Sequence, residues 1–173
     1  MKRLLLLRHA KSSWDDPNLS DFDRPLAPRG RQAAPRMGRE IARRGWTPAM
    51  ALVSPALRTR QTWDLVAAEL PGKPAVSYHE ALYEVAGDTL LEAIRRTPER
   101  VGDIVLVGHN PGMEELAAAL AGSGSAGKAL GRMAEKFPTG ALARFEFDGA
   151  WATLKPGTAR LTHFLRPKDL TPA

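Results

Sequence analysis

Two histidines in this chain follow apolar segments that are predicted to be β-strands. His9 ends the segment LLLLRH and His109 ends the segment IVLVGH. A third segment, SPALRTRQT, places Arg58 in the opening turn of a predicted helix. The carboxyl ends of parallel strands form the ligand crevice of open α/β sheets, so these segments are expected to meet in one crevice. That crevice would hold Arg8, His9, Arg58 and His109, which is typical of a site that handles phosphate.

Phosphoryl transfer needs a nucleophile in line with phosphorus and cationic donors for the non-bridging oxygens. A neutral imidazole is a competent acceptor at pH 7, so His9 is the candidate nucleophile. Arg8 and Arg58 carry planar guanidinium groups that match phosphate oxygens. His109 is a candidate donor of a further hydrogen bond as charge builds on the transferring group. This arrangement requires no metal and no cofactor.

The composition indicates one globular domain over residues 1–173. The chain has 173 residues, of which 43% are hydrophobic. Its apolar segments fall short of the ~20 residues that span a bilayer, and MKRLLLLRHA lacks the features of a signal peptide, so a cytoplasmic enzyme without a membrane partner is expected. The sequence has no cysteine, which excludes disulfides, a thiolate nucleophile and a cysteine-based zinc site.

The chain has a formal charge of +6. Much of it lies in RGRQAAPRMGREIARRG, which we interpret as the solvated face of a helix, because few aromatic residues and no nucleic-acid motif accompany it. No nucleic-acid partner is therefore expected. The segment GSGSAGKA resembles a Walker A loop, but Ala129 replaces the Ser or Thr that binds magnesium. We interpret it as a loop between helices.

Alternating apolar strands and amphipathic helices predict a three-layer α/β/α sandwich with a mostly parallel central sheet. Strands are predicted at 2–8, 49–54, 75–78, 103–108, 142–147 and 158–165, with a hairpin strand at 151–154. One helix is predicted from Pro28 to before Gly45, with a kink at Pro35, and a second from Pro55 to about Pro71. A third is predicted after an Asp88 cap and ends near Pro98, and a fourth follows an Asn110 cap with Pro111 in its first position.

The RHA tripeptide, the SPALRTRQT segment and the GHNP segment resemble the histidine phosphatase superfamily, which has the phosphoglycerate-mutase-like fold. Within it, RHAKSSW and DFDRPLAPRG are most similar to bacterial phosphohistidine phosphatases of the SixA type. The resemblance runs from about Lys2 to at least Pro111. It implies that His9 is transiently phosphorylated while Arg8, Arg58 and His109 hold the phosphoryl group, and that water then releases phosphate.

Many superfamily members use an acidic residue to protonate an alkoxide leaving group. Glu84 in ALYEVAGD is the candidate here, with Glu80 and Asp88 behind it, although a carboxylate in such a loop is more often exposed or capping. Without a donor, alcohol esters should react poorly, whereas imidazole leaves more easily. We therefore expect a phosphorylated protein carrying phosphohistidine as the substrate.

Two alternatives stay open. One is a small-molecule phosphomonoesterase of the same superfamily, and the other is a phosphate-binding adaptor without turnover. The sequence also leaves open the oligomeric state and the roles of Lys11, Arg24 and Asn110. For Arg24, pairing with a neighbouring aspartate is favoured over contact with substrate. His79 and His163 lack comparable partners and are expected to be structural or on the surface.

Overall fold

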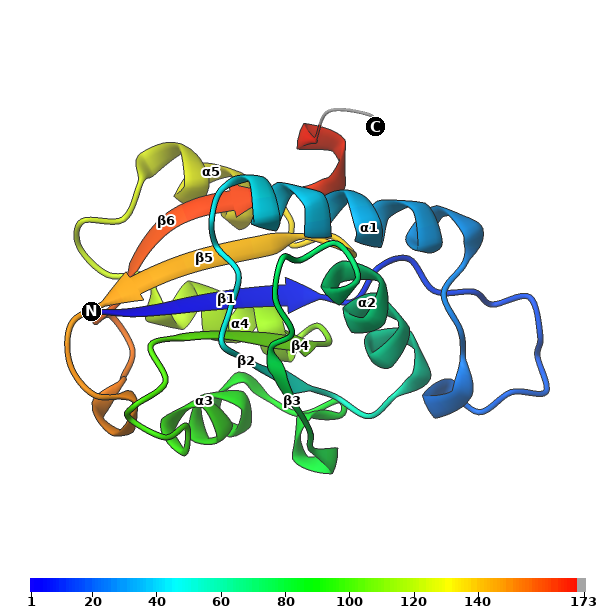
Figure 1. The fold of residues 1–173 in the computed structure, drawn as a ribbon, viewed down its shortest axis with the longest axis horizontal. Coiled ribbons are helices and arrows are strands. Elements are labelled where there is room, and N and C mark those ends of the chain that lie inside the picture. The colour runs from blue at the N-terminus through cyan, green and yellow to red at the C-terminus, as the bar shows by residue number, and fades with distance from the viewer. Residues whose placement is uncertain (171–173) are drawn as a thin grey trace.

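A single six-stranded sheet runs through the computed structural model, which describes residues 1–170 (Figure 1). The strands follow the order β3-β2-β4-β1-β5-β6 across the sheet. Neighbouring strands are parallel from β3 to β1, and β5 and β6 are antiparallel to their neighbours. Their bounds are β1 Lys2–Arg8, β2 Met50–Val53, β3 Ala75–Tyr78, β4 Asp103–Gly108, β5 Leu142–Phe147 and β6 Arg160–Leu165.

Helices cover both faces of the sheet. The apolar run of β1 supplies Leu5 and Leu7 to one core, together with side chains of α1 and α2. Leu4 and Leu6 point to the opposite core, which is shared with α3, α4 and α5. β1 is buried on both faces of the sheet, which explains why its residues are continuously apolar. The helices are α1 Pro28–Arg43, α2 Leu57–Ala67, α3 Gly87–Arg95, α4 Gly112–Leu120 and α5 Gly127–Glu135.

The predicted three-layer sandwich with a mostly parallel sheet is confirmed, but the predicted hairpin strand at 151–154 is wrong. Residues Trp151–Thr153 form a short 3-10 helix instead. The indole Nε1–H of Trp151 donates to the carbonyl of Val101 at 2.6 Å, and its backbone N–H donates to Glu99 at 2.9 Å. The apolar residues of this segment thus fill the core beside α3 rather than extend the sheet.

Three predicted helix starts are also wrong. The second helix begins at Leu57 rather than Pro55, because Thr59 Oγ1 donates to the carbonyls of Ser54 and Ala56 and holds the preceding residues in a turn. The third has Ala86, not Asp88, as its N-cap. In the fourth the N-cap is Pro111 and the helix starts at Gly112.

The basic helix is largely a solvated face, as predicted. Arg39 pairs with Glu69, while Arg43 and Arg44 both pair with Glu40. The helix continues through Pro35 and ends at Arg43, two residues before a Gly45 whose φ is +72°. The Walker-like segment forms the loop before α5, which begins within it at Gly127. Within residues 1–170, no helix has the length and apolar character that a membrane span requires.

Candidate active site

The register of the sheet brings the two candidate histidines together. Arg8 at the end of β1 pairs with Gly108 at the end of β4, so the residue that follows each of them is a histidine. The backbone N–H of His9 donates to the carbonyl of Gly108 at 3.1 Å. The imidazole rings of His9 and His109 lie 5.4 Å apart, centroid to centroid. Both side chains are buried, with 6% and 4% of their surface exposed.

The hydrogen bond made by His9 fixes which ring nitrogen is available for chemistry. Its Nδ1 lies 2.7 Å from the carbonyl oxygen of Ala10, which only accepts, so Nδ1 carries the proton and Nε2 holds the lone pair. Burial is the main cause that lowers the pKa of His9 to about 3, and the charges of Arg58 and Arg8 act in the same direction. The imidazole is therefore neutral at pH 7, as a phosphoryl acceptor must be.

His109 is held by Ser54 and Arg58. Its Nε2 lies 2.7 Å from Ser54 Oγ, and its Nδ1 lies 3.2 Å from Arg58 Nη2. Because a guanidinium only donates, Nδ1 is the acceptor and Nε2–H donates to the serine. Burial and then the charge of Arg58 lower the pKa of His109 to about 3. The fully buried Ser54 follows β2 directly, and the sequence analysis missed it.

Arg58 lies in the first turn of α2 and is only 2% exposed. Thr62, one turn later, accepts from the backbone N–H of Ala10 at 3.0 Å and donates to the carbonyl of Arg58 at 2.7 Å. This threonine joins the residue after His9 to the backbone of Arg58. The predicted placement of Arg58 beside the crevice is thus explained by a contact that the sequence analysis did not identify.

Arg8 and Arg58 each hold a buried donor without a partner. Arg8 Nη1 donates to the carbonyl of Phe137 at 3.0 Å, and Asn110 Nδ2 donates to the same oxygen at 3.0 Å. The Nε–H groups of both arginines are buried and find no hydrogen-bond acceptor within residues 1–170. A buried donor left unpaired costs about 1–3 kcal/mol.

Asp21, from the long loop after β1, is the main residue that sequence reasoning missed. Its carboxylate accepts hydrogen bonds from Tyr83 Oη at 2.6 Å, Arg58 Nη2 at 3.0 Å and Arg24 Nε at 3.1 Å. Partial burial by itself would raise the pKa of Asp21, but these donors lower it well below its usual range. Asp21 is also the neighbouring aspartate that pairs with Arg24, as the sequence favours. Nothing in the sequence pattern indicated its contact with Arg58.

Glu84, the candidate proton donor, does reach the site. Its Oε1 lies 3.1 Å from Arg58 Nη2, and the side chain is 52% exposed. Its backbone has a φ of +51°, a left-handed conformation that is uncommon for a residue other than glycine. The carboxylate is thus held beside the same guanidinium as Asp21. This geometry favours pairing with Arg58 over donation of a proton to a leaving group.

The other polar residues singled out in the sequence lie at the rim or elsewhere. Lys11 is exposed, and the guanidinium of Arg24 stacks on Trp14 at 3.5 Å from the ring centroid. His79 is exposed and contacts Ser77, while His163 packs on Trp46. Across residues 1–170, no three His, Asp or Glu side chains group as they would around a metal ion.

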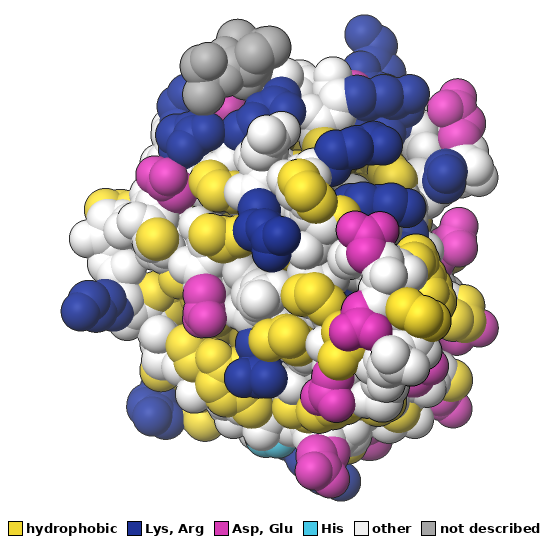
Figure 2. All heavy atoms as spheres, turned by 90° about the vertical axis from the view of Figure 1, so that its right-hand side faces the viewer, with side chains coloured by type: hydrophobic (Ala, Val, Ile, Leu, Met, Phe, Trp, Pro, Cys, Tyr) yellow, Lys and Arg dark blue, Asp and Glu magenta, His cyan; other side chains and the backbone are white. Residues whose placement is uncertain are grey.

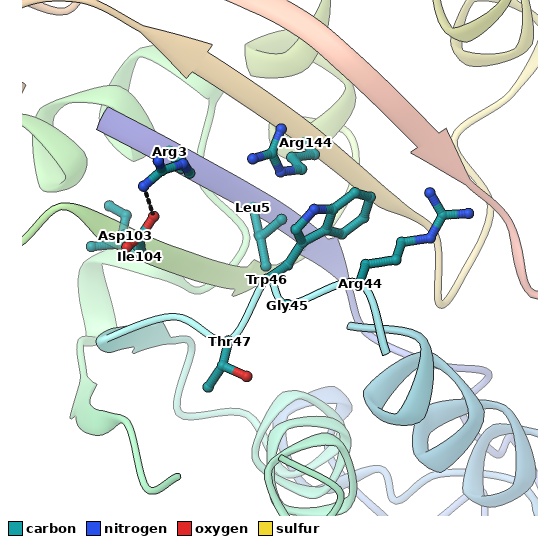
Figure 3. Close-up of a pocket in the computed structure, with 9 residues that line it drawn as sticks. All are labelled: Arg3, Leu5, Arg44, Gly45, Trp46, Thr47, Asp103, Ile104 and Arg144. Atoms are coloured by element: carbon teal, nitrogen blue, oxygen red, sulfur yellow. Dashed lines mark hydrogen bonds and ion pairs between the residues drawn. The ribbon is translucent and has the colours of Figure 1, made fainter. Parts of the chain in front are cut away.

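A separate cavity of about 390 Å³ lies at the opposite end of β1, near its first residues (Figure 3). Arg3, which pairs with Asp103, lines it together with Arg144 and Arg44, and the indole of Trp46 lies between the last two side chains. The guanidiniums of Arg44 and Arg144 lie about 5 Å from the centroid of that indole. The lining of the cavity contains neither candidate histidine, so the cavity is distinct from the candidate active site.

Comparison with known proteins identifies the family. A family model of the histidine phosphatase superfamily, branch 1, matches residues 4–105. An uncharacterized protein of Mycobacterium tuberculosis is 38% identical over 169 residues, which cover 94% of this chain and all of that protein. An uncharacterized chloroplastic protein of Arabidopsis thaliana is 39% identical over 132 residues, covering 70% of this chain and 60% of that protein.

Solved structures give the same assignment. A protein of Nakamurella multipartitia, provisionally named phosphohistidine phosphatase SixA, superposes with a TM-score of 0.82 at 30% identity, covering 96% of each chain. A protein of Agrobacterium tumefaciens with the same provisional name gives a TM-score of 0.80 at 32% identity, covering 96% of this chain and 99% of that one. The chain therefore belongs to the histidine phosphatase superfamily, branch 1, and is SixA-like within it.

Proposed function

We propose that this phosphatase removes the phosphoryl group from phosphohistidine on a protein through a phosphoenzyme formed on Nε2 of His9. One observation carries the proposal: a neutral imidazole with a defined free nitrogen lies close to the guanidinium charges of Arg8 and Arg58. A phosphoryl group supplies both an electrophile for that nitrogen and oxygen acceptors for the guanidinium groups. The provisional names of the two similar structures support the same substrate.

In the first step, the Nε2 lone pair of His9 attacks phosphorus and forms a P–N bond. The bond from phosphorus to the substrate imidazole breaks, and its electron pair leaves with that imidazole, which takes a proton from solvent. Arg8 and Arg58 bind the non-bridging oxygens and stabilise the transferring group. His9 keeps its orientation during the step because Nδ1–H remains bound to the carbonyl of Ala10.

In the second step, water attacks the phosphoryl group on His9, and the P–N bond breaks. The electron pair returns to Nε2, and the product leaves as dihydrogen phosphate, which carries the oxygen and both protons of water. His109 assists through Nδ1, which accepts from Arg58 Nη2 at 3.2 Å and so holds that guanidinium in place. Ser54 holds the ring in place through Nε2 in both steps.

The leaving group decides between protein phosphohistidine and phosphate esters. An alkoxide needs a positioned proton donor, whereas imidazole leaves with help from solvent alone. The first candidate for that role, Glu84, is paired with Arg58. The geometry therefore favours phosphohistidine as substrate over the alcohol esters of a small-molecule phosphomonoesterase.

A competition assay tests the proposal. Purified enzyme receives an equimolar mixture of a phosphohistidine peptide and a panel of sugar, glycerate and serine phosphates, and kcat/KM is compared. We expect the phosphohistidine peptide to be preferred by at least about a hundredfold, which is the lower range of a general-acid contribution. Faster turnover of any ester would assign the protein to the phosphomonoesterases. Phosphate binding with no turnover of any compound would assign it to the adaptors.

A further inference from the structure

A basic groove lies beside the phosphate-binding residues. It has a volume of about 440 Å³ and is lined by residues from the start of α1, the end of α5 and the short helix at Pro167–Asp169. Its lining residues include five cationic side chains and one carboxylate. They are Arg29, Arg132, Lys136, Arg166 and Lys168, with Glu135 as the carboxylate.

The wall of the groove is also the wall of the active site. Pro138 and Thr139 line the groove. Phe137, just before them, contacts Arg8, and Gly140, just after them, contacts His9. The carbonyl of Phe137 accepts from Arg8, and the N–H of Gly140 donates to the carbonyl of His9 at 2.9 Å. A polypeptide that delivers a phosphoryl group to His9 would therefore meet the groove on the same face.

Most of the positive charge in the groove is not neutralised. Arg166 is paired with Asp169 by two hydrogen bonds of 2.9 and 2.8 Å. The other four cations, Arg29, Arg132, Lys136 and Lys168, are exposed and have no carboxylate within 4.0 Å in residues 1–170. By contrast, Arg39, Arg43 and Arg44 at the far end of α1 are all paired with glutamates. An excess of one charge on a concave surface attracts partners of the opposite charge.

The loop after β1 is acidic. It carries three exposed aspartates, Asp15, Asp16 and Asp23, that form no ion pair within residues 1–170. Figure 2 looks onto the face at the carboxyl end of β1, where Lys and Arg side chains gather in the upper part and many of the Asp and Glu side chains lie to the right and below. A partner with an acidic patch on one side of its phosphohistidine would therefore bind in one orientation only.

We propose that the groove docks an acidic segment of the phosphorylated protein next to its phosphohistidine. This inference rests on the proposed function, because it names the partner that the same site would receive. Electrostatic attraction of this kind raises association rates and fixes orientation more than it raises the rate of chemistry. The groove thus affects kcat/KM for an acidic protein substrate and leaves the chemical step unchanged.

The lining argues against nucleic acid as the occupant. Sites for single-stranded nucleic acid combine basic residues with aromatic rings on which bases stack. The nine residues that line this groove include two prolines and a threonine but no aromatic side chain. Acidic side chains of a protein need only the cations.

Two synthetic peptides test the docking. Both carry one histidine, flanked in one peptide by four glutamates and in the other by four glutamines, and each is used with and without phosphorylation by phosphoramidate. The groove variant is R29Q/R132Q/K168Q, which removes one charge from each of the three elements. The matched control is K73Q/R100Q/K155Q, which removes the same charge from exposed positions outside the groove.

Binding of the unphosphorylated peptides is measured by fluorescence anisotropy, so the result is independent of turnover. We expect the glutamate peptide to bind wild type and control about tenfold more tightly than the glutamine peptide, and the groove variant to lose this preference. Equal binding of both peptides by wild type, or a preference retained by the groove variant, overturns the docking proposal. Tighter binding of an oligothymidine that only the groove variant loses would assign the groove to nucleic acid and overturn it as well.

Turnover separates this inference from the proposed function. We expect the phosphorylated glutamate peptide to lose about tenfold in kcat/KM in the groove variant, with kcat for phosphohistidine itself unchanged. If no phosphohistidine compound is turned over, the proposed function fails whatever the anisotropy shows. If wild type and the groove variant show the same kcat/KM for the glutamate phosphopeptide as for the glutamine phosphopeptide, the proposed function stands and the docking proposal fails.

Discussion

Lowering the pH from 7 to 5 is expected to destabilise the fold through the two histidines of the site. Burial is the main cause that lowers the pKa values of His9 and His109 to about 3, against 6.5 for an ordinary histidine. Both groups stay neutral in the fold at pH 5, whereas the unfolded chain protonates them. Between pH 3 and pH 6.5 the unfolded state therefore binds more protons than the folded state. The free energy of unfolding rises with pH in that window and decreases as the pH falls.

The size of the effect follows from the two pKa values. At pH 5 the solution is about 1.5 pH units below the ordinary pKa, and each unit corresponds to about 1.4 kcal/mol, so each histidine costs about 2 kcal/mol. The pair should lower the free energy of unfolding by about 4 kcal/mol, a large part of the 5–15 kcal/mol typical of a protein. Carboxyl groups add little to this loss between pH 7 and pH 5, because their ordinary pKa values, about 4, lie below that range.

Urea denaturation followed by tryptophan fluorescence at pH 7, 6 and 5 measures this loss. His9→Asn keeps a donor for the carbonyl of Ala10, and His109→Gln keeps a donor for Ser54, but neither titrates. Each variant should show about 2 kcal/mol less pH-dependent loss than wild type. His79→Gln, at an exposed position, is the control and should match wild type. If both site variants retain the full loss, the reasoning about buried neutral imidazoles is refuted.

Three further predictions concern the groups around the histidines. Ser54→Ala leaves a buried imidazole N–H without an acceptor and should lower the free energy of unfolding by about 1–3 kcal/mol in urea titrations; an unchanged midpoint would contradict this contact. Gly30→Ala places a Cβ 2.2 Å from the carbonyl oxygen of Lys11, so it should cost about 1–3 kcal/mol, whereas Gly131→Ala in open space should be neutral or stabilising. Glu84→Gln should leave kcat for a phosphohistidine peptide within about threefold, and a hundredfold loss would identify Glu84 as a proton donor.

The parts of the fold that the sequence predicted well are those governed by local pattern. The strands at β1 and β4 have the bounds expected from their apolar runs, and their parallel register brings His9 beside His109. Helix starts were less accurate where side chains compete for the same backbone groups. The turn before α2 depends on hydrogen bonds from Thr59, which no propensity rule places there.

The missed site residues depend on contacts between segments far apart in the chain. Asp21 reaches Arg58 across 37 positions, and Ser54 reaches His109 across 55. An aspartate in a polar loop and a serine before a proline are common residues with many local uses, so neither stands out in a single sequence. The hairpin strand predicted at 151–154 was wrong for a related reason. The hydrogen-bond partners of Trp151, Glu99 and Val101, lie about 50 residues earlier in the chain.

Trapping of the phosphoenzyme is the most direct test of the central claim, that Nε2 of His9 accepts the phosphoryl group. Enzyme mixed briefly with a phosphohistidine peptide is quenched in alkali, digested and analysed by mass spectrometry. The account predicts one acid-labile, alkali-stable phosphate on Nε2 of His9 in wild type, and no phosphate on the His9→Asn variant. Phosphate on another residue, or turnover retained by His9→Asn, would contradict it.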